Sequence, residues 1–186
     1  MRLPAPRIAP LSDEQLPPAA REVLDALPEY ARGFNIFRTQ AHNPEALAAF
    51  LAWGNYVLSA RNSLTPRQRE LAILRTGWNC KAGYEWAQHV VIGLNSGIAE
   101  SEIPAIKAGP DAPHWDPLEA AILRACDELG QNHHIADATW AALAPLGDTG
   151  RVDLIYTVGQ YTQVSMLLNS CGVQLDPGLR RDPDLG

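Results

Sequence analysis

The feature that most constrains the fold is a helix-start signal that recurs along the chain. A capping residue followed directly by proline precedes a helix-length segment at Asn43-Pro44, Thr65-Pro66 and Asp116-Pro117. Asparagine, threonine and aspartate are preferred N-caps, and proline is well suited to the first helical position. Apolar residues follow each signal at helical spacing. The sequence therefore predicts helices that begin near residues 44, 66 and 117.

The remaining segments also favour helices. Helices are expected over about 82–96, ending at Gly97, over about 100–107, and within 136–147, where Pro145 and Gly147 stop the helix. Residues 153–172 are rich in β-branched side chains, but their apolar residues follow helical spacing, so we expect a helix there as well. No segment combines alternating hydrophobicity with hairpin turn residues. The predicted fold class is all-α.

One domain accounts for the chain length. We expect an extended N-terminal arm over 1–17, a helical domain over 18–176 and a tail over 177–186. Five prolines, at positions 4, 6, 10, 17 and 18, delay the first helix until about Ala19. Arms of this kind often lie on a neighbouring subunit. A hydrophobic content of 46% with 19% charged residues is typical of a globular protein with a sizeable core.

The charge excludes some partners. A formal net charge of −6 argues against a nucleic-acid or anionic-membrane surface, which requires clustered Lys and Arg. No apolar run approaches the ~20 residues of a membrane span, and the proline-broken N-terminus does not resemble a signal peptide. We expect a soluble, cytoplasmic protein that acts on a small molecule.

Neither cysteine nor histidine spacing predicts a metal site. The three cysteines Cys80, Cys126 and Cys171 are far apart and contain no Cys-x-x-Cys, so a disulfide framework and a structural zinc site are not expected. The adjacent His133 and His134 do not share a helix face and lack ligand spacing. No cofactor is predicted.

Polar groups are concentrated in the apolar segment from Glu70 to Gly97. On a helix, Glu85 and His89 are four residues apart and share one face. They are surrounded by apolar residues, including Trp86, that leave little of the helix for water. Such a pair is either an ordinary exposed ion pair or a partly buried one with shifted pKa values, as acid/base catalysis requires. Glu70 can point back at this pair from a preceding antiparallel helix, or it can simply favour its own helix dipole.

The spacing of these residues resembles a known motif. In the redox branch of the carboxymuconolactone decarboxylase and alkylhydroperoxidase D superfamily, a Glu is followed after eleven residues by Cys-x-Tyr-Cys, three residues and a His. Glu70, Tyr84 and His89 match its Glu, Tyr and His, whereas Ala82 and Glu85 stand at the two cysteine positions. The similarity extends over roughly residues 33–176. It implies an all-α core around a two-helix hairpin, in a homo-oligomer such as a trimer, hexamer or dimer.

The missing thiols favour one branch of the superfamily over the other. Thiol peroxidases need a thiolate to attack peroxide and a second thiol to resolve the product. Cys80 lies two residues before the first cysteine position, which rotates it roughly 200° on an ideal helix. Peroxidase activity is therefore not expected, although a thiol redox protein that uses Cys80 stays an alternative. A catalytically silent, oligomeric binding protein is another.

The leading hypothesis is a cofactor-free lyase of the decarboxylase branch. The resemblance implies a carboxylated or lactone-type substrate of aromatic compound catabolism, and a decarboxylation or related lyase or isomerase step. We expect His89 and Glu85 to form the proton-transfer pair, Glu70 to orient or protonate His89, and Tyr84 to donate a hydrogen bond to an oxyanion.

Four residues are candidates for binding the substrate: Arg38, Arg75, Trp86 and Cys80. Guanidinium groups pair bidentately with carboxylates, so the two arginines suit an acidic substrate. Both arginines equally suit a surface or an intersubunit position. Cys80 also suits the position of a small buried hydrophobic residue.

Overall fold

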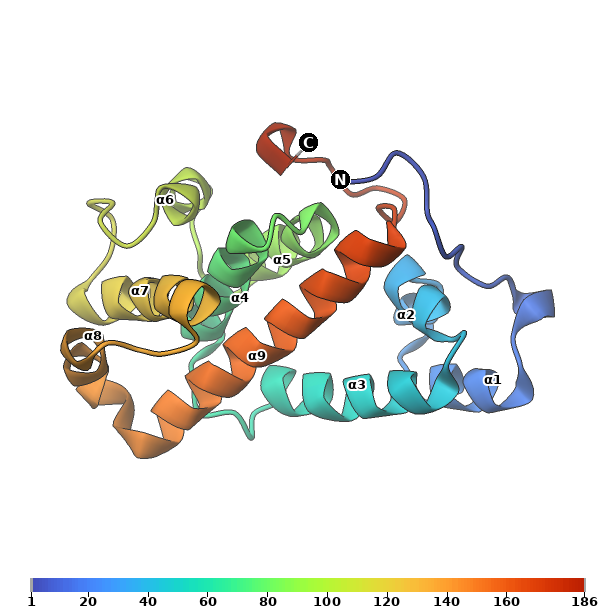
Figure 1. Cartoon of the computed structure of the whole chain (residues 1–186), viewed down its shortest axis with the longest axis horizontal. Helices are drawn as coiled ribbons and strands as arrows, with labels where there is room; N and C mark the ends of the chain where they lie inside the picture. Colours follow the sequence, from blue (N-terminus) through green and yellow to red (C-terminus); the bar gives the residue numbers. More distant parts are fainter. Residues whose placement is uncertain (1, 186) are drawn as a thin grey trace.

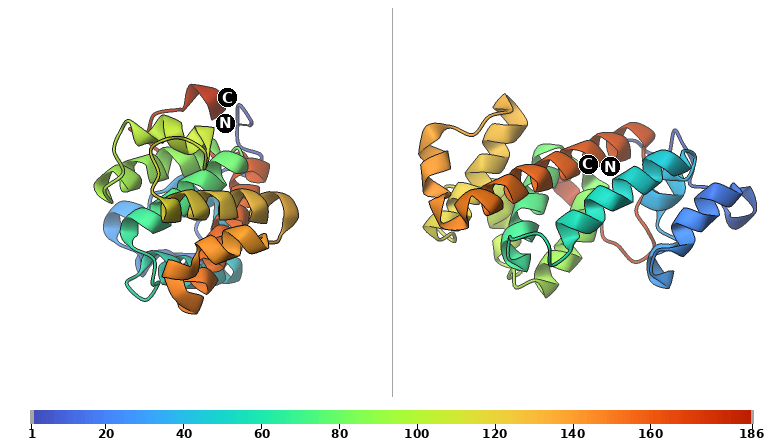
Figure 2. Two further views of the ribbon diagram at one scale, coloured as in Figure 1. Left: turned by 90° about the vertical axis from the view of Figure 1, so that its left-hand side faces the viewer. Right: turned by 90° about the horizontal axis from the view of Figure 1, so that it is seen from below.

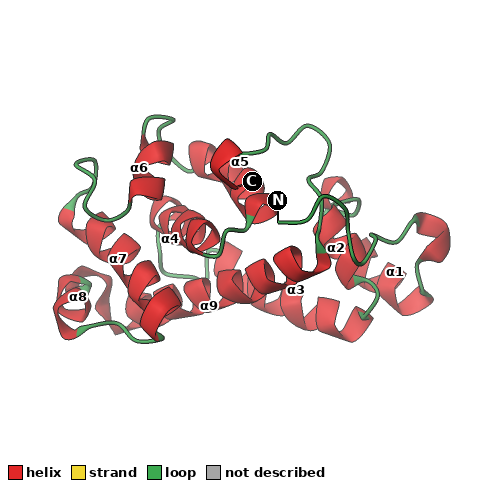
Figure 3. Cartoon of the chain, turned by 45° about the horizontal axis from the view of Figure 1, so that its top comes forward, coloured by secondary structure: helices red, strands yellow, loops and turns green. Residues whose placement is uncertain are grey.

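The structure, a computed structural model, describes residues 2–185; Met1 and Gly186 lie outside the described residues. Helices and loops account for this whole span, and no strand occurs in it (Figure 3). The α-helices of residues 2–185 are α1 (Pro18–Asp25), α2 (Asn35–Gln40), α3 (Pro44–Leu58), α4 (Pro66–Asn79), α5 (Gly83–Asn95), α6 (Glu102–Ala108), α7 (Pro117–Asn132), α8 (Asp137–Ala142) and α9 (Gly147–Cys171). The predicted all-α class is confirmed. None of the helices in residues 2–185 combines the length and hydrophobicity that a membrane span requires.

The predicted caps begin their helices as expected. The Asn43 side chain accepts a hydrogen bond from the Ala46 N–H at 3.1 Å at the start of α3. Capping boxes begin α4, at Thr65, and α7, at Asp116. These interactions satisfy backbone donors that have no partner within the helix, which is why such short sequence signals locate helix starts well.

One predicted helix stop is instead a helix start. Helix α8 ends at Ala142, a short 3₁₀ turn follows over Ala144–Leu146, and Gly147 begins α9. The backbone φ of Gly147 is 65°, which a residue without Cβ adopts readily. Gly147 therefore turns the chain into a new helix, and α9 is longer than predicted, with 25 residues.

Helix α4 is the centre of the molecule and packs against α5, α7 and α9. All of residues 70–77 are buried in the described chain, so this helix has apolar contacts on every side. Helix α9 crosses in front of it, with α1–α3 toward one end of the elongated molecule and α6–α8 toward the other (Figures 1 and 2).

Helices α4 and α5 form the expected antiparallel hairpin. The connection is short, with Lys81 in the left-handed region at φ 53° and the Ala82 N–H donating to the Gly77 carbonyl at 2.9 Å. Glycine at position 93 keeps the helices close, because a Cβ there would lie 3.2 Å from Leu74 Cδ1 and 3.8 Å from Glu70 Cβ. The hairpin thereby brings α5 against Glu70.

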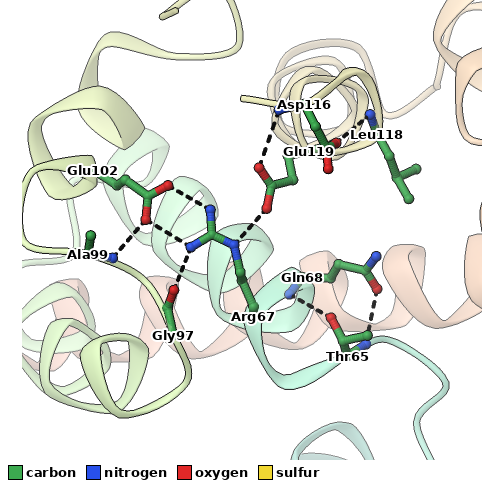
Figure 4. Close-up of polar contacts among 9 residues, drawn as sticks. All are labelled: Thr65, Arg67, Gln68, Gly97, Ala99, Glu102, Asp116, Leu118 and Glu119. Atoms are coloured by element: carbon green, nitrogen blue, oxygen red, sulfur yellow. Dashed lines mark hydrogen bonds and ion pairs between the residues drawn. The ribbon is translucent and has the colours of Figure 1, made fainter. Parts of the chain in front are cut away.

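An arginine network fixes the start of α4. The Arg67 guanidinium donates to both carboxylate oxygens of Glu102 in α6, at 2.8 and 2.6 Å, and to Glu119 in α7 at 2.7 Å (Figure 4). Its Nη1 also donates to the Gly97 carbonyl at 2.7 Å. Such bidentate, charge-assisted bonds are geometrically specific. They tie the first turn of α4 to α6, to α7 and to the end of the hairpin.

Both terminal segments pack on the helical core of the same chain. The Arg7 N–H donates to the carbonyl of Cys171 at the end of α9 at 2.7 Å, and the Leu11 N–H donates to Arg38 in α2 at 3.2 Å. At the other end, Lys107 in α6 contacts Asp182 at 2.7 Å. The segment before α1 contains a 3₁₀ turn at Asp13–Gln15.

Candidate active site

Two carboxylates contact the His89 imidazole in the α4–α5 hairpin. His89 Nδ1 lies 2.7 Å from Glu70 Oε2, and His89 Nε2 lies 2.9 Å from Glu85 Oε1. All three side chains are buried, with Glu70 inaccessible to solvent. Glu85 and His89 meet because they are one turn apart on α5, and Glu70 joins them because the hairpin packs α4 on that face. The sequence-predicted convergence of these three residues is observed.

The two carboxylates control the charge of His89. Burial alone would lower the pKa of the imidazole, but the charges of Glu70 and Glu85 and their hydrogen bonds raise the pKa to about 10. The ring is therefore an imidazolium at neutral pH and donates from both nitrogens. With both glutamates ionised, the cluster keeps one net negative charge.

The two glutamates differ in their access to the cavity. Glu70 Oε1 is buried and receives no hydrogen bond from any described residue. Glu85 lines a cavity, whereas Glu70 does not. Glu85 is thus the carboxylate that a bound molecule can reach.

The cavity lies between α3, α5, α9 and the segment from Leu27 to Phe37, and its volume is about 390 Å³. Besides Glu85 and His89, it is lined mainly by apolar and aromatic side chains. Tyr30, 76% exposed, stands at its edge. A mostly apolar cavity with a few convergent polar groups is typical of a small-molecule site.

Tyr161 of α9 completes the cluster and was not identified as a functional residue from the sequence. Its ring lies edge-on to His89, with centroids 4.9 Å apart and planes at 88°. No hydrogen bond to its hydroxyl is found among residues 2–185, and the side chain lines the cavity. Burial and the charges of Glu85 and Glu70 raise its pKa well above the usual value, so the phenol keeps its proton. In the sequence, Tyr161 was one more residue on the apolar face of a helix, and no local signal marked it.

Tyr84 lines the same cavity, but its hydroxyl already has a hydrogen-bond partner within the chain. Its hydroxyl donates to Asp176, which also accepts the Gln88 amide at 2.8 Å and the Asn35 N–H at 2.8 Å. Burial, followed by the bond to Asp176, raises the pKa of Tyr84. This geometry does not support the expected role of Tyr84 as an oxyanion donor. The hydroxyl instead ties α5 to the segment after α9.

The two candidate substrate-binding arginines both lie outside the cavity lining. Arg38 makes an ion pair with Asp13 at 2.6 Å. Arg75 donates to both oxygens of Asp127 in α7, at 2.6 and 2.8 Å, and to two carbonyls at the end of α6. Their donors hold elements of the chain together and are not turned toward a ligand.

Trp86 and Cys80 are also outside the cavity lining. Trp86 is buried against Trp78, with ring centroids 5.5 Å apart, in the core cluster on the other side of the hairpin. Cys80 is half-buried at the end of α4, where its carbonyl accepts the Asn169 amide at 2.9 Å. Burial raises the pKa of its thiol.

Among residues 2–185, no group of three or more His, Cys, Asp or Glu side chains is arranged to hold a metal ion. Both ring nitrogens of His89 contact carboxylates.

A comparison with protein families finds a match that includes the α4–α5 hairpin. The sequence model of the carboxymuconolactone decarboxylase family matches residues 44–128, which span α3 to α7. The resemblance inferred from the motif is therefore confirmed. Among curated proteins, no sequence matches the chain.

Solved structures share the fold. An uncharacterised peroxidase-related protein from Silicibacter sp. TM1040 superposes with a TM-score of 0.78 at 16% identity, covering 94% of this chain and 95% of its own. The alkylhydroperoxidase AhpD core protein from Ralstonia eutropha JMP134, also described as peroxidase-related, gives 0.71 at 20% identity, with 97% and 96% coverage. A variant of the debrominase Bmp8 in complex with 2,3,4-tribromopyrrole gives 0.72 at 14% identity, with 94% of each chain covered. The fold is alkylhydroperoxidase D-like, as expected.

Proposed function

Because residues 44–128 form a carboxymuconolactone decarboxylase family segment within an alkylhydroperoxidase D-like fold, we propose that the protein is a cofactor-free acid/base enzyme. It moves a proton on a small molecule held in the cavity between α3, α5 and α9. The observation that carries this proposal is the Glu85 carboxylate, which lines an apolar cavity and is backed by the buried His89 imidazolium.

The proposed step is proton abstraction from a carbon next to a carbonyl group. The Glu85 carboxylate takes the proton, and the electron pair of the C–H bond moves into the carbonyl to form an enolate. The Tyr161 hydroxyl donates a hydrogen bond to the enolate oxygen. In a β,γ-unsaturated substrate, the proton then returns from Glu85 to the γ-carbon, and the double bond moves to the α,β position. In a substrate with a leaving group on the β-carbon, the enolate electron pair instead forms an α,β double bond and expels that group, which is a lyase step.

His89 and Glu70 act through Glu85 in this scheme. Because the His89 imidazolium donates to Glu85 at 2.9 Å and to Glu70 at 2.7 Å, it fixes the carboxylate that faces the ligand. We therefore treat both as positioning residues. Decarboxylation of an acidic substrate remains a second form of the same chemistry, but no Lys or Arg belongs to the described lining of the cavity to hold the carboxylate.

Peroxide reduction is the competing candidate. The comparisons include peroxidase-related proteins, so they give no reason to dismiss it. Against it, Ala82 and Glu85 replace the two thiols of the redox motif, and the raised pKa of Cys80 disfavours the thiolate. A catalytically silent binding protein is the third candidate.

A proton-exchange screen tests the proposal. Ketones, lactones and esters with acidic C–H bonds are incubated with the protein in D2O, and deuterium incorporation is followed by NMR. We expect exchange that is abolished in Glu85→Gln and retained in Glu45→Gln, which alters an exposed glutamate of α3. Equal exchange in both variants would contradict the role of Glu85. Thiol-dependent peroxide consumption that disappears in Cys80→Ser would instead support the redox candidate.

A further inference from the structure

The lining of the cavity restricts the kind of molecule that fits it. Its walls are built largely from Phe34, Phe37, Phe50, Leu51, Ile92 and Val164. At about 390 Å³, the volume is within the usual range for small-molecule sites and holds a molecule of one or two rings. Most of the ligand surface therefore has to be apolar.

Two of the buried polar groups of the lining are acceptors. Glu85 presents a carboxylate, and Gln160, which is 1% exposed, has a buried Oε1 that receives no hydrogen bond from any described residue. The amide of Gln160 donates to the Phe50 carbonyl at 3.4 Å, and that of Gln88 donates to Asp176 at 2.8 Å. Tyr161 contributes an uncommitted donor. A ligand that satisfies Gln160 must therefore supply an O–H or N–H group.

The cavity is poorly suited to an anion. None of the described residues that line it is Lys or Arg, and the charge of His89 is already matched by two carboxylates. Arg69, whose positive charge acts on Tyr161, is not part of the lining. A carboxylate placed here would lose its hydration without gaining a cation and would face the cluster's net negative charge.

We propose that the cavity takes an uncharged, predominantly apolar ring compound that carries a carbonyl oxygen for Tyr161 and at least one O–H or N–H donor for Gln160, and that it discriminates against carboxylates. This inference rests on the proposed function for the site and names its substrate class. It replaces the carboxylated substrate that the family resemblance implied.

Binding of three matched probes, measured by calorimetry at pH 7.5, tests the inference. Methyl 4-hydroxybenzoate has the required carbonyl and donor, 4-hydroxybenzoate adds a charge, and methyl 4-methoxybenzoate lacks the donor. We expect the hydroxy ester to bind at least about tenfold more tightly than either of the other two. In Gln160→Leu, the advantage of the hydroxy ester over the methoxy ester is lost.

Charge variants provide the matched controls. Asn55, an exposed residue at the cavity edge, is replaced by Arg or Gln. Asn55→Arg should improve binding of 4-hydroxybenzoate by about tenfold, whereas Asn55→Gln should not. Glu85→Gln should also improve binding of this acid, because it removes a negative charge from the lining.

Two results would overturn the substrate class. One is that the wild-type protein binds 4-hydroxybenzoate as tightly as the hydroxy ester. If Arg69 pairs with the carboxylate in that case, Arg69→Gln should abolish binding of the acid. The other is the absence of saturable binding of the hydroxy ester up to millimolar concentration. Neither depends on turnover. If uncharged ring compounds bind as expected but none exchanges a proton, the substrate class stands and the proposed function fails.

Discussion

Glu70 Oε2 lies 2.7 Å from His89 Nδ1, although the two residues are 19 positions apart and belong to opposite helices of the α4–α5 hairpin. Glu85 contacts the other ring nitrogen, Nε2, so the buried imidazolium lies between two carboxylates. This arrangement separates the roles of the two glutamates. Glu70 is sealed in the core and anchors the imidazolium, while Glu85 faces the cavity and can exchange a proton with a ligand.

Glu85→Gln should lower kcat on a substrate found in the exchange screen by at least about a hundredfold, because a positioned general base contributes roughly 10²–10⁴ to a rate. The amide is nearly isosteric, so thermal unfolding should stay cooperative. Glu45→Gln, at the exposed start of α3, should leave kcat unchanged. A kcat within a few-fold of wild type for Glu85→Gln would rule out the assigned base.

The protonation of His89 should make stability fall with rising pH. Its pKa is raised from 6.5 to about 10 in the folded protein, so the folded state binds the proton more tightly than the unfolded chain. The resulting stabilisation is fully present below about pH 6.5 and is lost as the pH rises toward about 10. Urea unfolding between pH 6 and 10 should show a steeper loss for wild type than for His89→Gln.

If His89→Gln does not fold, NMR of the wild-type imidazole supplies the same information. The His89 ring should remain doubly protonated at pH 8. A ring that loses its proton near pH 6.5 would contradict the assigned charge.

Tyr84→Phe should lower stability, whereas Tyr161→Phe should lower kcat. Tyr84 donates to the Asp176 carboxylate, so its loss should lower the free energy of unfolding by about 1–3 kcal/mol. The Tyr161 hydroxyl has no hydrogen bond among residues 2–185, so Tyr161→Phe should leave stability nearly unchanged but lower kcat, by up to about a hundredfold. Denaturant unfolding and kinetics on both variants check this. A larger kcat loss in Tyr84→Phe would return the oxyanion role to Tyr84.

Arg75→Met should destabilise the fold without weakening ligand binding by the folded protein. It removes the guanidinium from Asp127 and from two carbonyl groups at the end of α6, and breaking a buried ion pair in this way costs about 3–5 kcal/mol. The double variant Arg75→Met/Asp127→Leu should recover part of the loss. Selective loss of affinity for acidic ligands in a stable Arg75→Met protein would show instead that Arg75 binds substrate.

Cys80 should react slowly with iodoacetamide. Burial raises the pKa of its thiol, and the thiolate is the reactive form. At pH 8, alkylation of Cys80 in the folded protein should be slower than in the urea-unfolded chain, as measured by mass spectrometry of the Cys80 peptide. Faster modification in the folded state would indicate an activated thiol and favour the redox candidate.

Much of the helical framework could be predicted because its signals are local. Thr65 and Gln68 cap α4 through bonds that span three residues, and Asp116 and Glu119 do the same for α7. Gly147 shows the limit of such signals. A glycine after a proline was expected to end a helix, but the same backbone freedom let it turn the chain and begin α9.

The sequence by itself determined the helices, the shared face of Glu85 and His89, and the replacement of both motif thiols, because each depends only on spacing along the chain. The tertiary structure alone decided which groups are committed and which are available. The Tyr84 hydroxyl donates to Asp176, which is 92 residues away in the sequence, and the Arg75 guanidinium donates to Asp127, which is 52 residues away. Tyr161 reaches His89 only because α9 packs across the hairpin. Each side chain can donate only a few hydrogen bonds, and the packing of segments that are distant in the sequence determines which acceptors receive them.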